Sequence, residues 1–151
     1  MAEVTRATPR QLLRRVGVTG LITGPVLVFV GLTGAALVAG TNADSTVSAP
    51  SPVYGVVFFM VIAAHGLIEL AAGAVALFAV TKLPDTSRPY GVNDFLSFAA
   101  VVVTFLGAVF QVVLNEPLVA MLVVAMAAIV LLTTSATRKA MRAAAEGVEA
   151  P

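Results

Sequence analysis

The stretch VVFFMVIAAHGLIELAAGAVALFAV, residues 56–80, decides the fold of this chain. It is apolar apart from His65 and Glu69, and as a helix it is long enough to cross the roughly 30 Å hydrocarbon core of a bilayer. His65 is the single histidine of the chain, and Glu69 is the only acid inside an apolar run. The stretch therefore predicts a membrane-spanning helix that carries two ionisable residues.

The composition of the 151-residue chain extends this prediction to the whole molecule. Hydrophobic residues make up 59% and charged residues 11%, a balance far from that of a soluble domain. Apolar runs predict four spans, at residues 17–39, 53–80, 95–114 and 118–134. We expect an all-α fold, an integral membrane four-helix transmembrane bundle that occupies residues 1–151 as a single domain.

The nine basic residues predict the orientation of the bundle. Four precede the first span, two lie in the loop 81–94, and three follow the last span. The loops 40–52 and 115–117 carry none. Because basic residues accumulate on the cytoplasmic side, we expect cytoplasmic tails at 1–16 and 135–151, with short basic helical ends. This N-in/C-in arrangement predicts a multi-pass protein of a cell membrane, such as a bacterial inner membrane.

Local signals predict where individual helices begin. Thr8 can cap orphan amides and Pro9 suits a first helical position, so a basic helix is expected to start there and lead into the first span. Asn93 or Asp94 is expected to cap the third span. A removed signal peptide is the alternative for residues 17–39, but that segment is longer than the usual apolar region of such peptides.

Small residues follow one face of the first span. Gly17, Gly20, Gly24 and Gly31 recur at spacings of three, four and seven, which permits another helix to approach closely. The partner of these glycines is either a helix of the same bundle or a second copy of the chain. Pro25 removes a helical hydrogen bond, so a kink is expected at that position.

His65 and Glu69 form the candidate site. At a spacing of four residues they share one helical face and can interact directly. Ionisable residues within spans are rare and usually face a protein interior or a water-filled cavity. Thr104, on the third span, lies near the depth of His65 and is expected to complete an intramembrane polar site. This site either binds a proton or an ion, or fixes helix packing through hydrogen bonds.

Missing residue types exclude several activities. The chain has no cysteine, and a lone histidine cannot supply a multi-histidine metal site or bis-histidine haem ligation. No phosphate-binding glycine loop or serine nucleophile motif is present. We therefore expect no enzyme, no cofactor and no metal. The N-terminal arginines lack interleaved aromatic residues, so their expected partner is the lipid bilayer, with no nucleic acid.

These features predict one function and leave one alternative to it. The first is a noncatalytic accessory or assembly subunit that packs against itself, as a homo-oligomer, or against a larger membrane complex through small-residue faces. The second is a small oligomeric proton- or cation-coupled transporter or channel that uses Glu69 and His65 near the membrane midplane.

Overall fold

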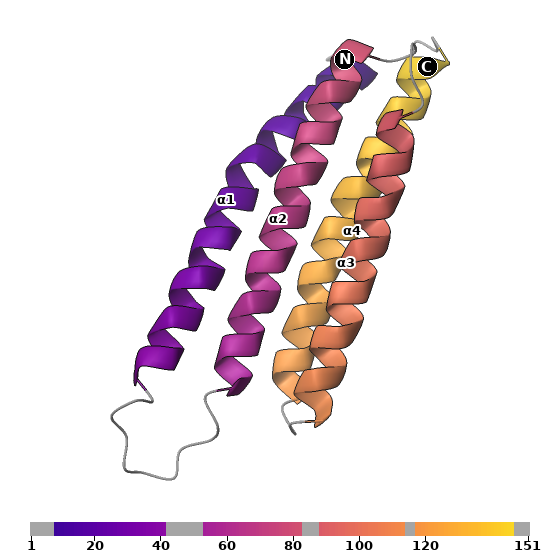
Figure 1. Ribbon diagram of the computed structural model, residues 1–151. Coiled ribbons are helices and arrows are strands. Elements are labelled where there is room, and N and C mark those ends of the chain that lie inside the picture. Colours follow the sequence, from indigo (N-terminus) through magenta and orange to yellow (C-terminus); the bar gives the residue numbers. More distant parts are fainter. Residues whose placement is uncertain (1–7, 42–52, 83–87, 114–116, 147–151) are drawn as a thin grey trace, which may run out of the picture.

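Four α-helices make up the fold (Figure 1). The computed structural model describes residues 8–41, 53–82, 88–113 and 117–146. The helices are α1 (Pro9–Thr41), α2 (Val53–Lys82), α3 (Arg88–Val113) and α4 (Pro117–Ala145). Each is long and apolar enough to cross a membrane. The all-helical class and four helices long and apolar enough to span a membrane are thus confirmed. Residues 1–7, 42–52, 83–87, 114–116 and 147–151, which include most of the predicted loop 40–52 and two residues of the predicted turn at 115–117, lie outside the described residues.

Helix α2 is the centre of the bundle, because it contacts each of the other three helices. Helix α1 packs mainly on α2, and α3 packs mainly on α4 as the short connection between their spans predicts. Over the described residues α1 and α3 do not touch. Neighbouring helices along the chain are antiparallel, so α1 begins and α4 ends at the same end of the bundle (Figure 1). Residues 56–80 therefore form the central helix of the fold.

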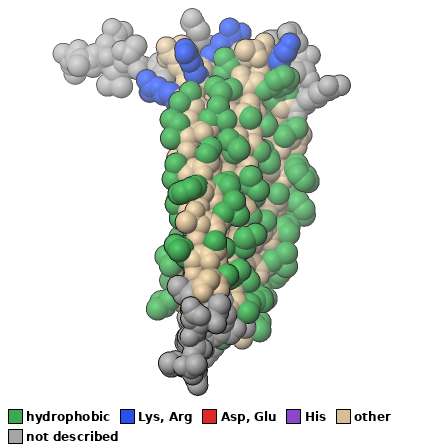
Figure 2. All heavy atoms as spheres, turned by 60° about the vertical axis from the view of Figure 1, so that its left-hand side comes forward, with side chains coloured by type: hydrophobic (Ala, Val, Ile, Leu, Met, Phe, Trp, Pro, Cys, Tyr) green, Lys and Arg blue, Asp and Glu red, His purple; other side chains and the backbone are tan. Residues whose placement is uncertain are grey.

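The outer surface of the bundle is apolar along its length. Large side chains such as Phe29, Phe105 and Leu118 are mostly exposed. Hydrophobic side chains cover the face drawn in Figure 2, and basic side chains gather at one end of it. The described helices place Arg10, Arg14, Arg15, Lys82, Arg138, Lys139 and Arg142 toward their ends at that side. This surface fits a multi-pass membrane protein, since such side chains are stable in lipid.

One predicted helix start is confirmed and one is wrong. Helix α1 begins at Pro9, where the Gln11 amide donates to the Thr8 hydroxyl at 3.3 Å and the Thr8 amide donates to the Gln11 side chain at 3.1 Å. Helix α3 begins at Arg88, so Asn93 and Asp94 lie inside it and cap nothing. Pro89 suits the first turn of a helix, and it starts α3 before those two residues are reached.

Helices α1 and α2 approach until their backbones touch. A Cβ atom added at Gly20 would lie 2.8 Å from the Glu69 carbonyl oxygen. One added at Gly73 would lie 2.8 Å from the Gly17 carbonyl oxygen and 2.9 Å from the Leu21 amide nitrogen. Only glycine fits at such distances. The close contact between α1 and α2, called the seam below, therefore needs glycines on both helices.

The four predicted packing glycines all lie on this seam. Added Cβ atoms would meet Gly73 and Leu77 from Gly17, Leu70 from Gly24, and Ala63 from Gly31. All of these partners belong to α2 of the same chain, which leaves this face of α1 covered. Helix α1 continues as one helix through Pro25, whose ring is exposed on the other side. The kink predicted at Pro25 stays a prediction.

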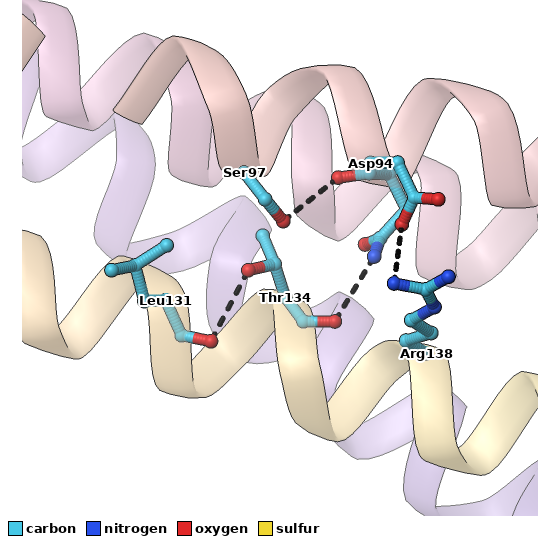
Figure 3. Close-up of polar contacts among 6 residues, drawn as sticks. Asp94, Ser97, Leu131, Thr134 and Arg138 are labelled. Carbon is cyan, nitrogen blue, oxygen red and sulfur yellow. Dashed lines mark hydrogen bonds and ion pairs between the residues drawn. The ribbon is translucent and has the colours of Figure 1, made fainter. Parts of the chain in front are cut away.

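Polar contacts join α3 to α4 near the basic end (Figure 3). The Asn93 side-chain amide donates to the Thr134 carbonyl oxygen at 3.0 Å, and Arg138 lies 3.3 Å from Asp94. Ser97 donates to the Asn93 carbonyl oxygen at 3.0 Å. Because Asp94 and Arg138 are both about half exposed, their pair contributes at most about 1 kcal/mol. Asn93 is buried, so its bond is the one that fixes the two helices.

Candidate functional site

His65 is fully buried between α2 and α3. Its Nδ1 lies 2.8 Å from the Val61 carbonyl oxygen, and its Nε2 lies 3.1 Å from the Thr104 hydroxyl oxygen. The Thr104 hydroxyl in turn donates to the Ala100 carbonyl oxygen at 2.7 Å. The structure therefore brings together the histidine and the threonine that the depth count placed at one level, and both ring nitrogens have a partner.

The number of protons in this network decides its charge. Carbonyl oxygens only accept, so Nδ1 carries a proton toward Val61. Hydrogen bonds at all three contacts need three protons, whereas a neutral imidazole and one hydroxyl supply two. An imidazolium supplies the third and satisfies every contact. With a neutral ring, the Thr104 hydroxyl can turn to Nε2, because the helix backbone already donates to the Ala100 carbonyl. The network thus holds either charge state without moving a heavy atom.

Glu69 lies one helical turn further along α2 than His65 and faces α1 and α4 rather than α3. Its side chain is only 4% exposed and forms part of the wall of a cavity between α1 and α4. The Thr133 hydroxyl of α4 lies beside it and donates to the Ile129 carbonyl oxygen at 3.1 Å. Within the described helices, neither His65 nor any Lys or Arg comes within 4.0 Å of the carboxylate. The direct interaction that the spacing of His65 and Glu69 permits is absent there, and among the described residues the carboxyl has no cationic partner.

The cavity beside Glu69 has a volume of about 650 Å³ and opens to the surface between α1 and α4. This volume falls in the range of small-molecule sites. Its walls are mostly apolar, with Arg15 and Thr19 as the polar residues nearest the basic end. The apolar part includes Ile22, Val26, Leu27, Ile129 and Leu132. Because Ile22, Val26 and Ile129 are themselves exposed, the opening faces the side of the bundle that lipid would cover.

Two residues of this site were missed by the sequence analysis, namely Thr133 and Arg15. A signal for Thr133 was present: it lies 16 residues after Pro117, and Glu69 lies 16 residues after Val53. Because neighbouring spans are antiparallel, α2 and α4 start at the same membrane face. Both residues then lie roughly 24 Å from that face. No comparable signal existed for Arg15, because its place at the cavity depends on how α1 is rotated.

No protein-family model, curated protein or solved structure matches this chain. The arrangement of its own residues therefore carries the functional argument. Over the described part of the chain, no three acidic or histidine side chains gather as a metal site would require. Among the described residues, the buried ionisable groups within the bundle are the Glu69 carboxyl in its cavity and His65 in its network with Thr104.

Proposed function

We propose that the protein is a small membrane carrier that takes up a proton or a cation at Glu69. The observation that carries this proposal is a buried carboxyl in the wall of a lateral cavity, with no cationic side chain in ion-pair distance among the described residues. An isolated carboxylate in apolar surroundings is very unfavourable, so the group needs a proton or a mobile cation. Loading and unloading at one carboxyl is the elementary step of a coupled carrier.

The His65–Thr104 network supports the same function. Its centre lies four residues from Glu69, which is roughly 6 Å along the axis of α2. Its hydrogen-bond geometry is compatible with an additional proton on the imidazole as well as with a neutral ring. A second proton-holding group at this separation gives a proton a stopping place between Glu69 and the far end of the bundle. Transfer between the two groups needs bridging water, because they do not touch.

The role of accessory subunit finds less support. It relied on Gly20 and Gly24 as an exposed small-residue face, and α2 of the same chain covers both residues. A partner protein or a second copy would need another surface. Assembly into a homo-oligomer or a larger complex stays a prediction, and so does the absence of enzymatic activity.

We also propose that the basic end of the bundle faces the cytoplasm. Arg14, Arg15, Arg138 and Lys139 lie at that end, and basic residues beside spans are retained on the cytoplasmic side. Both termini then lie in the cytoplasm of a cell whose membrane is the bacterial inner membrane or an equivalent. In this orientation Glu69 lies in the inner half of the bilayer.

Proton or cation flux into liposomes tests the proposed function. Wild-type protein is expected to raise flux above that of empty vesicles under an imposed potential, and Glu69→Gln is expected to return it to background. The amide keeps the shape of the side chain but cannot exchange a proton or pair with a cation. Glu146→Gln, at the exposed end of α4, is the matched control and should behave as wild type. Equal flux from wild type and Glu69→Gln would reject the proposal.

A further inference from the structure

The size and lining of the Glu69 cavity indicate which class of ligand it can bind. A site for a bare proton or metal ion needs polar ligands and little space, since small cations are held by several oxygen atoms. This cavity is lined by one glutamate, three threonines, Arg15 at its rim and a large apolar wall, within about 650 Å³. Its chemistry is that of a site for an organic molecule, in which apolar walls bury the body and few polar groups orient it.

Charges along the cavity fix the orientation of such a molecule. Gly20, whose added Cβ would lie 2.8 Å from the Glu69 carbonyl oxygen, stands five residues beyond Arg15 on α1. Arg15 at the rim is therefore roughly 8 Å along the axis from the level of Glu69. Val26 lies on the far side of that level, deeper in the span. A cationic group is drawn to Glu69 and repelled by Arg15, so the apolar body must extend toward Val26 and Ile129.

We propose that the ligand of this cavity is an amphipathic organic cation, which enters sideways from the lipid. Its charged group pairs with the Glu69 carboxylate and its body fills the apolar wall between α1 and α4. The proposal rests on the proposed function, because it names the substrate class of the same carboxyl. An anionic amphiphile would be repelled by the Glu69 carboxylate and could pair only with Arg15 at the rim. A lipid acyl chain would fill the apolar wall without offering a charge to Glu69, which would then have to hold a proton.

Equilibrium binding of tetraphenylphosphonium to the purified full-length protein in mild detergent tests this inference. Saturable binding is expected for wild type, with Glu69→Gln weakening it roughly 10-fold or more, as for the loss of a buried charge-assisted contact. Tetraphenylborate, which has nearly the same shape and the opposite charge, should not bind saturably. Glu146→Gln should match wild type.

A second variant keeps the test valid if Glu69→Gln does not fold. Val26→Trp fills the apolar part of the cavity from an exposed position, so the bundle should tolerate it while losing tetraphenylphosphonium binding. Binding that is insensitive to both variants, or equal binding of the two ions, would overturn the inference. If Glu69-dependent flux of protons or inorganic cations is measured without any tetraphenylphosphonium binding, the carrier function stands and the ligand class proposed for it is wrong.

Discussion

Gly73→Leu is expected to destabilise the protein by about 3 kcal/mol or more, because overpacking a close contact between two backbones cannot be relieved by turning a side chain. An added Cβ at this position already meets backbone atoms of Gly17, Gly20 and Leu21 at 3.0 Å or less. The whole of α1 would have to move away from α2. The midpoint temperature for loss of monodisperse protein, measured by size exclusion after heating in mild detergent, should fall by roughly 10 °C.

Gly91→Leu provides the matched control for this prediction. Gly91 lies in α3 with no atom within 4 Å of an added Cβ, so the same substitution meets open space. Leucine also favours the helix over glycine, and the control should be as stable as wild type or slightly more stable. Equal losses at positions 73 and 91 would mean that α1 and α2 do not pack through this seam.

Thr104→Val is expected to destabilise the protein by about 1–3 kcal/mol, since it leaves the buried Nε2 of His65 without a hydrogen-bond partner. Valine keeps the volume of threonine, so the loss reports the hydroxyl rather than a cavity. The same heating assay measures it. A small loss of stability would contradict this role of the hydroxyl, because it would mean that water satisfies Nε2 of His65 in the variant.

Thr23→Val is the control for that measurement. Its hydroxyl is exposed and donates only to the Thr19 carbonyl oxygen of its own helix, at 3.0 Å. Removing such a bond should change stability by less than about 0.5 kcal/mol. A loss at Thr23 as large as that at Thr104 would contradict the role assigned to the buried network.

Much of the fold follows from the sequence because hydropathy and helix length act locally. The span of residues 56–80 is apolar whatever surrounds it, and the three-residue connection before Leu118 forces two helices together. The wrong prediction of a helix start at Asn93 or Asp94 has a local origin too. Both residue types are good helix caps, but Pro89 lies before them in the chain and suits the first turn, so α3 already begins at Arg88. The spacing of the glycines predicts a helix face that allows close packing, but only the structure shows that α2 packs against it.

The geometry of the site was harder to predict. A spacing of four residues leaves His65 and Glu69 roughly 40° apart around the helix and roughly 6 Å apart along it. On a central helix with three neighbours, that offset is enough to turn one residue to α3 and the other toward α1 and α4. Sequence spacing alone cannot show which neighbouring helix each side chain faces. The pair expected from i and i+4 is therefore two separate sites.

This separation changes what Glu69 can do. A carboxyl paired with an imidazolium would be a structural ion pair, closed to ligands. Here His65 is satisfied by Val61 and Thr104, and the carboxyl faces a cavity open to the side of the bundle. The central claim of this account is that Glu69 is reachable from the membrane.

Labelling with a hydrophobic carbodiimide tests that claim most directly. The reagent partitions into lipid and adds to a protonated carboxyl, leaving a stable adduct that peptide mass spectrometry locates. In native protein in liposomes we expect an adduct on Glu69 and none on Glu146, with labelling reduced by tetraphenylphosphonium. Glu69 that stays unlabelled in the native protein, yet is labelled once the bundle is unfolded in SDS, would contradict the account.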